Sequence, residues 1–307
     1  MSAIQKMIFY LTKNKNLIPL LILHRLSFLF KDKLYLKLLF RFSMGYSLDL
    51  HFPKTFCEKM QWLKLYNRNP LYPSLVDKAE VKRYVADIIG EKYIIPTIFV
   101  FESVNDLDID LLPNKFVLKT THGGGGNGVI ICKDKSRLNI DEIKRKLTLS
   151  LKADIYKHYR EWPYKDVPKK IIAEEYINDD KSSEDLIDYK FFCFDGKALY
   201  CQVITNRTED ETIDFYDRDW IHQEFIGLSP NVHHSERICE KPINYEEMLY
   251  IVDKLAISIN IPFVRIDLYN IDGNIYFGEI TFFPASGIGQ FKPDKWDRIL
   301  GNMINLK

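Results

Sequence analysis

The sequence of 307 residues lacks the features that define several common classes of protein. Its five cysteines are odd in number, widely spread and without a C-x-x-C pair, so we interpret them as reduced, mostly buried thiols of a cytoplasmic protein. The chain also lacks a charge excess, because 43 basic and 42 acidic residues leave a net charge of +1. A nearly neutral chain offers no global field for nucleic acid or acidic polymers, so we expect no nucleic-acid partner.

A long apolar run is missing as well. In residues 1–44 the longest uncharged run, residues 16–23, is too short to span a bilayer, and no small-residue cleavage site follows it. This region holds eight Lys or Arg against one acid, Asp32, with apolar runs between them. Two interpretations stay open: a basic amphipathic segment in peripheral contact with the inner membrane face, or helices that cap the following domain.

The composition that is present predicts a globular protein with a substantial core. Hydrophobic residues make up 46% of the chain and aromatic residues 14%. At this length the chain could form one large domain or two medium ones. No internal repeat or low-complexity tract is visible.

The clearest chemical signal is the glycine-rich stretch at residues 115–133, KFVLKTTHGGGGNGVIICK. Four glycines, Gly123 to Gly126, precede Asn127 and Gly128, and Lys119 lies four residues upstream. The β-branched runs on both sides predict a strand, a loop and a second strand. A loop with so few side chains lets backbone N–H groups approach a polyphosphate, although a flexible hairpin tip has the same composition.

The residues around this loop exclude better-known phosphate motifs. Gly123 and Gly128 have the spacing of a Walker A motif, but Val129 and Ile130 stand where that motif requires Lys and Ser or Thr. A dinucleotide fold needs a helix after the loop, whereas VIICK is typical of a strand. A protein kinase needs HRD and DFG motifs, and neither occurs in the chain.

Hydrophobic periodicity predicts helices and strands on both sides of the glycine hairpin. A short helix follows residues 53–55, with Thr55 as its N-cap and Glu58 three residues later. The other expected elements are a helix at 74–89 closed by Gly90, a strand at 93–101 interrupted by Pro96, a helix at 141–159, a strand at 169–177, a hairpin at 189–204 turning at Asp195–Gly196, an irregular stretch at 206–240 and a helix at 245–259. His233 and His234 are expected in a solvated loop.

Residues 263–283 predict a last hairpin that carries charged side chains. Alternation places Arg265 and Asp267 on one face of its first strand. The same alternation places Phe277, Glu279 and Thr281 on one face of its second strand.

The length of the turn decides whether the two acids of this hairpin meet. A two-residue Asp-Gly turn would pair Asp267 with Gly278, whereas a three-residue Asp-Gly-Asn turn pairs Asp267 with Glu279. Facing carboxylates repel each other unless a cation lies between them. We therefore predict the three-residue turn and a Mg²⁺ site made by Asp267 and Glu279, against the alternative of two independent surface acids.

Taken together, these segments resemble the ATP-grasp superfamily. The order is a lysine on a strand, a glycine hairpin, a strand ending in E-E-Y-I, and R-x-D followed twelve residues later by E-x-T. Within that superfamily the chain is most similar to the TupA-like amidoligase group, which is associated with bacterial surface-polysaccharide loci. The similar segments are FPKTFCEKMQWLKLYNRNPLYPSLVDK, IGEKYIIP, DYKFFCFDGK and FGEITFFPASG, within roughly residues 45–305.

The resemblance implies an α+β protein with the ATP-grasp fold, in which two α+β subdomains sandwich the nucleotide after a helical N-terminal region. The expected divisions are 1–50 for the basic amphipathic helical region, 51–97 for a helical segment before the core, 98–177 for the subdomain with the glycine-rich lid, and 178–307 for the subdomain with the metal site.

By position, the resemblance also implies an ATP site. Lys119 would contact the α- and β-phosphates, and the glycine loop with His122 would close over the β- and γ-phosphates. Glu175 and Ile177 would read adenine largely through their backbone. The implied nucleotide-binding residues are Lys78, Lys119, Gly123, Gly124, Gly125, Gly126, Asn127, Glu174, Glu175 and Ile177.

The residues implied for catalysis are Arg265, Lys190 and His122. Arg265 would hold the acylphosphate or its transition state, and Lys190 the γ-phosphate. The implied Mg²⁺ ligands are Asp267, Glu279 and Thr281. Thr281 departs from the family pattern, which commonly has asparagine there, and its shorter reach implies that a second Mg²⁺ would be weaker or bound through water.

The function implied is that of an ATP- and Mg²⁺-dependent carboxylate–amine ligase. It would join an amine such as an amino acid to a sugar carboxylate such as a uronic acid, either small or linked to a lipid or nucleotide. Two alternatives use the same nucleotide site: an ATP-grasp sugar kinase or phosphotransferase, and a nucleotide-binding scaffold that recruits glycan enzymes.

Overall fold

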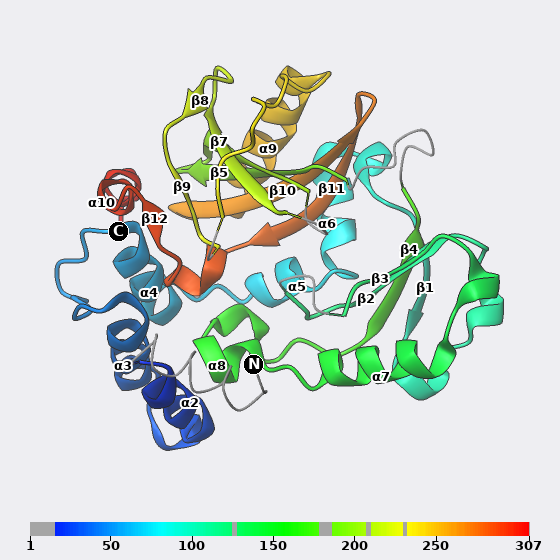
Figure 1. Ribbon diagram of the computed structural model, residues 1–307, viewed down its shortest axis with the longest axis horizontal. Helices are drawn as coiled ribbons and strands as arrows, with labels where there is room; N and C mark the ends of the chain where they lie inside the picture. The colour runs from blue at the N-terminus through cyan, green and yellow to red at the C-terminus, as the bar shows by residue number, and fades with distance from the viewer. Residues whose placement is uncertain (1–15, 125–127, 178–185, 207–209, 230–231, 307) are drawn as a thin grey trace.

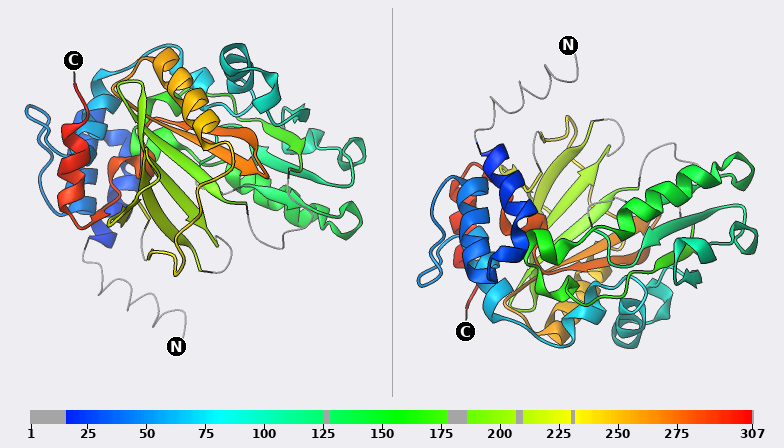
Figure 2. Two further views of the ribbon diagram at one scale, coloured as in Figure 1. Left: turned by 90° about the horizontal axis from the view of Figure 1, so that it is seen from above. Right: turned by 90° about the horizontal axis from the view of Figure 1, so that it is seen from below.

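The computed structural model describes residues 16–124, 128–177, 186–206, 210–229 and 232–306. Two antiparallel sheets, one of six strands and one of four, form the two halves of the molecule (Figure 1). The N-terminal helices lie at the end of the molecule away from the four-stranded sheet, as the views from above and below also show (Figure 2).

The six-stranded sheet has the order β11-β10-β5-β6-β7-β8. Its strands are β5 (Asp188–Phe194), β6 (Lys197–Thr205), β7 (Thr212–Asp217), β8 (His222–Gln223), β10 (Phe263–Ile271) and β11 (Asn274–Thr281). Helix α9 (Tyr245–Ile259) covers one face, and its Met248, Val252 and Leu255 are buried there. The predicted helix at 245–259 and the hairpin that turns at Asp195–Gly196 are confirmed.

The four-stranded sheet has the order β1-β4-β2-β3 and a smaller core of its own. Its strands are β1 (Thr97–Phe101), β2 (Phe116–Thr120), β3 (Ile130–Cys132) and β4 (Ile171–Glu175). Helix α7 (Ile140–Leu151) packs Ile143 and Leu147 against Phe116 and Leu118. Strands β2 and β3 pair antiparallel, which confirms the predicted strand, loop and strand around the glycines.

The N-terminal helices join the larger core. They are α2 (Leu17–Arg25), α3 (Asp32–Met44) and α4 (Phe56–Tyr66). Helix α3 buries one side, Tyr35, Leu36, Leu39 and Phe40, in the core that also contains the six-stranded sheet. Helix α4 begins with the predicted capping box, in which Thr55 and Glu58 exchange hydrogen bonds. Among the helices of the described residues, none has the length and apolarity needed to cross a bilayer.

Shorter elements complete the described chain. They are α5 (Tyr72–Val76), α6 (Val81–Ile89), α8 (Ile155–Tyr159), α10 (Lys295–Asn302), β9 (Ile226–Gly227), β12 (Phe291–Lys292) and the 3₁₀ turns η1 (Ser27–Leu29), η2 (Glu91–Tyr93), η3 (Val104–Asp106), η4 (Ile109–Leu111), η5 (Lys135–Arg137), η6 (Trp162–Tyr164) and η7 (Pro284–Gly287).

The predicted helix at 74–89 is wrong in its continuity, because the chain turns between α5 and α6. The carboxylate of Asp77 accepts hydrogen bonds from the N–H groups of Ala79 and Glu80, at 2.8 and 3.1 Å. This local bond competes with helix geometry and starts α6 afresh. The break places the N–H of Lys78 on the Thr121 carbonyl, at 3.0 Å, beside the glycine loop.

Three other predicted boundaries also change. The predicted helix at 141–159 is split into α7 and α8, with Asp154 as the N-cap of the second helix. The predicted strand at 93–101 begins only at Thr97, after Pro96. The stretch at 206–240 is not wholly irregular, because it contains β7, whose apolar and polar residues follow no clean alternation.

In the last hairpin Asp267 and Glu279 face each other as predicted, but the turn that joins the two strands differs from the predicted one. Ile271 pairs with Asn274, so only Asp272 and Gly273 form the turn, and the predicted three-residue turn is wrong. Both turn residues have positive φ angles, +50° and +86°, as an Asp-Gly type I′ turn favours. Asp267 nevertheless pairs with Glu279, because a β-bulge leaves Gly278 as an extra residue.

The bulge also changes which side chains of β11 share a face. Phe277 pairs with Leu268, whereas Glu279 pairs with Asp267, and neighbouring residues of β10 point to opposite faces. Phe277 is therefore buried in the core while Glu279 lies on the charged face, so the prediction that both share one face is wrong.

Candidate functional site

A first group of charged residues lies on the face of the six-stranded sheet turned away from α9. We call it the β10 cluster: Lys190, Arg265, Asp267, Glu279 and Thr281. Register puts Asp267 between Lys190 on β5 and Glu279 on β11. Phe191, the neighbour of Lys190, stacks on Tyr245 of α9, so Lys190 points to the other side of the sheet.

One nitrogen of Arg265 joins the three predicted metal ligands. Its Nη2 donates to oxygens of Asp267 at 2.8 Å, Glu279 at 2.9 Å and Thr281 at 3.0 Å. Its Nε donates to the second oxygen of Asp267 at 2.7 Å, and Nζ of Lys190 lies 2.5 Å from Asp267. The sheet therefore brings all five predicted residues of this cluster together.

The cations around Glu279 and Asp267 affect the two carboxyls differently. Burial alone would raise the pKa of Glu279, but the charges of Lys78, Arg265 and Lys190 lower it to about 2. For Asp267 burial dominates and raises the pKa, although Arg265 and Lys190 act against it. Glu279 is therefore the firmly ionised member of the pair at neutral pH.

The β10 cluster fits a magnesium ion by its donor set. Mg²⁺ prefers hard oxygen ligands and is usually bound by one or two carboxylates together with substrate phosphates and water. The oxygens of Asp267, Glu279 and Thr281 already converge on one positively charged nitrogen of Arg265. A metal ion near that point would share the ligands that Arg265 now holds.

A second group lies at the four-stranded sheet, and we call it the β2 cluster: Lys82, Lys119 and Glu174. Glu174 of β4 is only 4% exposed and lies 2.6 Å from Nζ of Lys119 on β2 and 2.6 Å from Nζ of Lys82 on α6. Burial would raise the pKa of Glu174, but the two lysines lower it below its ordinary value. Two cations on one carboxylate leave this cluster with a net positive charge.

Lys78 connects the two clusters. Its Nζ donates to the carbonyl of Gly123 at the start of the glycine loop. Burial lowers the pKa of Lys78, and the negative charge of Glu279 is the strongest influence that raises it. The lysine from the turn between α5 and α6 thus lies near both the loop and the β10 cluster.

The described part of the glycine loop is tied to α7. Gly123 and Gly124 follow β2, whereas Gly125, Gly126 and Asn127 lie outside the described residues. Gly128 has a φ angle of +87°, and a Cβ there would lie 2.2 Å from Oγ of Ser150 on α7. Only glycine fits this position, because any side chain would meet both a strained backbone and Ser150.

His122 is buried rather than placed at an open loop edge. It is 3% exposed, and neither ring nitrogen has a well-formed hydrogen bond among the described residues. Burial and the charge of Lys169 lower the pKa of His122, while the Ala153 carbonyl acts in the opposite direction. The imidazole is therefore neutral at pH 7.

The predicted adenine-reading residues lie at the end of β4. Glu175 pairs with Phe116 of β2, and its N–H donates to the Pro96 carbonyl at 3.0 Å. Its side chain is exposed, and Ile177 follows two residues after it. The Glu175 N–H is thus already used within the protein.

Sequence reasoning missed a buried cluster beside Arg265. Glu161 accepts a hydrogen bond from the Ser286 hydroxyl at 2.6 Å, and Lys64 donates to the Ser286 carbonyl at 2.7 Å. Burial raises the pKa of Glu161, and the charges of Lys64 and then Arg265 lower it. Ser286 lies in FFPASG and Lys64 in KMQWLKLY, segments that carry the family resemblance, whereas no local pattern distinguishes Glu161.

Lys82 was also missed. It is one of many lysines on a helix surface, and its pairing with Glu174 depends on how α6 packs beside β4. A charged residue four positions after Lys78 carries no signal of its own in the sequence.

Solved structures with similarity to this chain include several ligases. D-alanine–D-alanine ligase from Bacillus anthracis, complexed with ATP, is 20% identical with a TM-score of 0.38, over 68% of this chain and 53% of that one. L-amino acid ligase from Bacillus licheniformis is 16% identical with a TM-score of 0.42, over 76% and 50%. The ATP-grasp ligase PsnB, complexed with its minimal precursor, Mg and ADP, is 10% identical with a TM-score of 0.36, over 74% and 57%.

The chain spans about half the length of these three proteins. The search of curated proteins found no match. The family model described as TupA-like ATP-grasp matches residues 58–305, which include both charged clusters and the glycine loop. The family match, the two sheets and the N-terminal helices confirm the predicted α+β ATP-grasp fold with its helical N-terminal region, and the chain belongs to the TupA-like ATP-grasp family.

Proposed function

We propose that this protein is an ATP- and Mg²⁺-dependent carboxylate–amine ligase that acts on a sugar carboxylate in surface-polysaccharide biosynthesis. The observation that carries the proposal is the convergence of Asp267, Glu279 and Thr281 on one nitrogen of Arg265. This arrangement offers oxygen ligands and a fixed cation side by side, which is what phosphoryl transfer requires.

In the proposed reaction a carboxylate oxygen attacks the γ-phosphorus of ATP, the bond from that phosphorus to the bridging oxygen breaks, and ADP leaves. The nitrogen of an amine then attacks the carbonyl carbon of the acylphosphate. The bond from that carbon to the phosphate oxygen breaks, phosphate leaves, and the amine nitrogen loses a proton. Neither step needs a covalent bond to the protein.

The residues of the two clusters would have different roles in this reaction. Lys119 and the glycine loop, with Lys78 at its start, would hold the phosphates, and the backbone near Glu175 and Ile177 would contact adenine. Arg265 and Lys190 would stabilise the charge that develops on the transferred phosphoryl group. Mg²⁺ bound by Asp267 and Glu279, with Thr281, would neutralise phosphate charge. The neutral, buried His122 would support the loop by packing and not by charge.

We further propose that the buried group around Glu161 marks the acceptor side of the site. Lys64, Glu161 and Ser286 are close enough to Arg265 and Glu279 for their charges to act on one another. A carboxylate that reaches Arg265 would therefore lie near the Ser286 hydroxyl and within the field of the buried Lys64 charge. These groups suit a substrate rich in hydroxyl and carboxylate oxygens, such as a uronic acid.

The test is incubation of the purified protein with ATP, Mg²⁺, uronic acids labelled with ¹⁸O in the carboxylate, and pooled amino acids. A ligase releases ADP, forms an amide detectable by mass spectrometry and transfers one ¹⁸O to phosphate. A phosphorylated sugar without an amide would instead support the kinase. Asp267→Asn should abolish turnover, whereas Asp166→Asn, an exposed carboxylate without such contacts, should not. If the protein binds ATP but forms neither an amide nor a phosphorylated sugar, the result would support the scaffold alternative.

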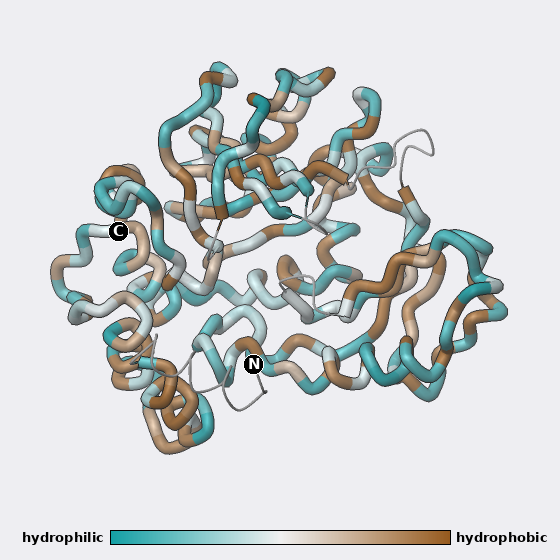
Figure 3. The backbone as a smooth tube through the Cα atoms, in the orientation of Figure 1, coloured by the Kyte–Doolittle hydropathy of each residue, from teal (hydrophilic) through white to brown (hydrophobic). Residues whose placement is uncertain are grey.

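We also propose that the protein is cytoplasmic and that its N-terminal region contacts the inner membrane face. Phe28 is 75% exposed and Leu29 63% exposed, although both are large and apolar. The backbone tube at the lower left of Figure 3, where α2 and η1 lie, contains brown stretches of hydrophobic residues. Basic residues of α3, including Lys33 and Lys37, follow directly in the sequence, as in segments that bind anionic lipid.

Point charges test this contact better than truncation does, because α3 is part of the main core. The double variant Phe28→Asp/Leu29→Asp should lose flotation with anionic liposomes while it keeps its melting temperature. Liposomes of zwitterionic lipid are the matched control and should bind less. Equal flotation of both proteins would contradict the membrane contact and leave the ligase proposal untouched.

A further inference from the structure

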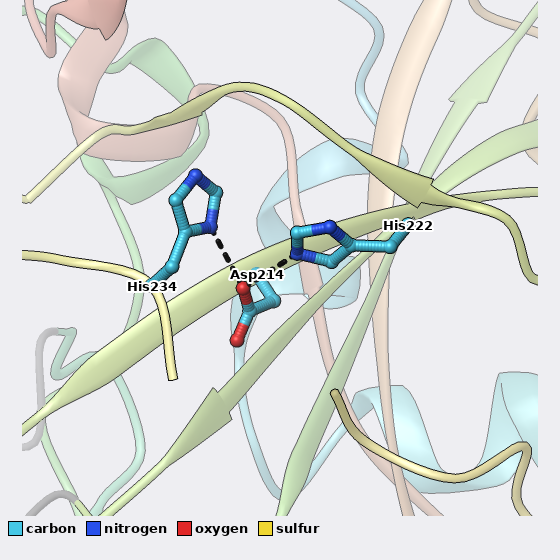
Figure 4. A group of neighbouring side chains, drawn as sticks. All are labelled: Asp214, His222 and His234. Atoms are coloured by element: carbon cyan, nitrogen blue, oxygen red, sulfur yellow. Dashed lines mark hydrogen bonds and ion pairs between the residues drawn. The ribbon is translucent and has the colours of Figure 1, made fainter. Parts of the chain in front are cut away.

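A second group of possible metal ligands lies away from the ATP site. Asp214 on β7, His222 on β8 and His234 in the segment after residue 231 point toward one another (Figure 4). Oδ1 of Asp214 lies 2.8 Å from Nε2 of His222 and 2.8 Å from Nδ1 of His234. The three ligand atoms all lie within 4.8 Å of one another.

Backbone contacts hold the three residues in place. The N–H of Ile213 donates to the His233 carbonyl at 3.0 Å, which fixes the segment that carries His234 beside β7. Pairing of Tyr216 with His222 fixes β8 on the other side. The N–H of Ser235 donates to Oδ2 of Asp214 at 3.1 Å, which leaves Oδ1 aimed at the two imidazoles. Such a bond to the second oxygen is what orients carboxylate ligands in metal sites.

The charge around Asp214 is also suited to a cation. The side chain of Asp214 is 6% exposed, and among the described residues its ion-pair partners are the two histidines and no lysine or arginine. A buried carboxylate is stabilised by a full positive charge, and a bound metal ion would supply one here. The imidazoles keep 27% and 37% of their side-chain surface exposed, so an ion from solvent can reach them.

This group belongs to the opposite face of the six-stranded sheet from the β10 cluster. Lys190 pairs with Gln202 of β6, which pairs with Phe215 of β7, so Phe215 shares the face of Lys190. Asp214 is the neighbour of Phe215 and therefore points to the other face, where α9 packs. The group thus has no part in the phosphoryl chemistry proposed for Asp267 and Glu279.

We propose that Asp214, His222 and His234 bind one divalent transition-metal ion of the zinc type. Two imidazoles and one carboxylate are a known zinc ligand set, and the nitrogen ligands disfavour Mg²⁺ and Ca²⁺. Ligands about 2.0 to 2.1 Å from a tetrahedral ion lie roughly 3.3 Å apart, so the present 2.8 Å contacts need to widen by only about half an ångström. Water completes the coordination.

The ion would fasten three separate segments, β7, β8 and the segment that carries His234. β8 is the edge strand of the six-stranded sheet, and β7 lies next to it. The role of the ion is therefore structural, and metal binding at this site does not depend on whether the protein is a ligase.

The test uses the full chain without a histidine tag, stripped with a chelator and dialysed. Zn²⁺ is titrated against a chromophoric chelator, and Co²⁺ is added in parallel to record its visible d–d absorption. One equivalent of tightly held Zn²⁺, with Co²⁺ bands of a four- or five-coordinate ion, is expected. No bound equivalent, or only the spectrum of hexaaqua Co²⁺, would overturn the proposal and leave a hydrogen-bonded triad.

Variants locate the site if an ion binds. His222→Ala and His234→Ala should each weaken Zn²⁺ binding at least about tenfold. His233→Ala is the matched control, because His233 is the sequence neighbour of His234 but its side chain contacts Asp210 at 3.4 Å and not Asp214. Asp267→Asn is a second control for the ATP site. Unchanged Zn²⁺ affinity in the His222→Ala/His234→Ala double variant, or loss in either control alone, would also overturn the proposal. Because Co²⁺ spectra of the native chain need no variant, a variant that fails to fold does not remove the test.

Discussion

The β10 cluster and the β2 cluster contain similar ion pairs but rest on different supports. In both, the central carboxylate is nearly buried, with 3% of the Asp267 side chain and 5% of the Glu174 side chain exposed. The β10 cluster lies on the six-stranded sheet, within the core that also includes α9 and the N-terminal helices. Lys119 and Glu174 of the β2 cluster lie on a four-stranded sheet whose core is confined to that sheet, α7 and the turns before β2, and only Lys82 comes from α6 of the larger core.

This difference indicates a division between a rigid half and a half that opens more easily. Local opening costs less free energy where fewer apolar side chains are buried together. In the proposed reaction the β10 cluster would hold charged oxygens in fixed positions for chemistry, and the loop beside the β2 cluster would admit ATP. The larger core therefore supports the group whose geometry matters most.

The substitution with the largest expected effect is Arg265→Ala in the β10 cluster. Removal of this cation leaves Asp267 and Glu279 facing each other in a largely buried position, so we expect turnover to fall by about 10²- to 10³-fold and stability by about 3 to 5 kcal/mol. Steady-state kinetics and urea unfolding measure the two effects.

The double variant Arg265→Ala/Asp267→Asn is the control for Arg265→Ala. It removes one charge of each sign, so it should recover stability but not turnover. A single variant with the turnover of the native protein would show that Arg265 has no part in the reaction.

The second variant addresses the other half. Lys119→Met should weaken ATP binding by roughly 10- to 100-fold, the equivalent of one charge-assisted hydrogen bond, and should affect turnover at saturating ATP less. Lys82→Met is matched to it, because both lysines lie 2.6 Å from Glu174. Calorimetry should find a smaller change for Lys82→Met. Equal losses would mean that both variants act only through Glu174.

A glycine substitution tests whether the half with the four-stranded sheet opens separately from the other half. Gly128→Ala places a Cβ 2.2 Å from Ser150 Oγ at a φ angle of +87°, and we expect a cost of about 1 to 3 kcal/mol. Hydrogen exchange should accelerate in β2 and α7 but not in β5 and β10. Gly90→Ala is the control, because its φ angle is +109° but no atom lies within 4 Å of the added Cβ. Uniform acceleration in both sheets would contradict two separately opening halves.

The smallest effect concerns pH. Because the cations hold the pKa of Glu279 at about 2 against an ordinary 4.5, its ionised form favours the folded state above pH 4.5. That contribution disappears as the pH falls from 4.5 toward 2. The difference in unfolding free energy between the native protein and Glu279→Gln should therefore shrink over that range. A difference independent of pH would show that the cations do not act on Glu279.

The sequence predicts the elements whose pattern is local and fails where distant groups decide. The capping box at Thr55 and the helix at 245–259 depend on residues within a few positions of each other, and both are confirmed. The break at Asp77 was missed because a side chain competes with the helix there, although the apolar spacing continues. The facing of Asp267 and Glu279 was predicted, but through the wrong turn.

The partners of the predicted site residues were much harder to predict. That Lys82 pairs with Glu174, or that Glu161 lies beside Arg265, follows from the packing of elements far apart in the chain. No spacing rule relates such residues.

The bulge at Gly278 shifts the alternation of buried and exposed residues in β11 by one position. On the turn side the buried residues are odd-numbered, Ile275 and Phe277, and beyond Gly278 they are even-numbered, Ile280 and Phe282. Deletion of Gly278 would therefore restore a regular two-residue repeat and keep every side chain on its face. Deletion of Tyr276 would instead turn Phe277 out of the core. Loss of one residue at the bulge would therefore keep the buried side chains of β11 in the core. Loss of one residue nearer the turn would move a buried side chain to the surface.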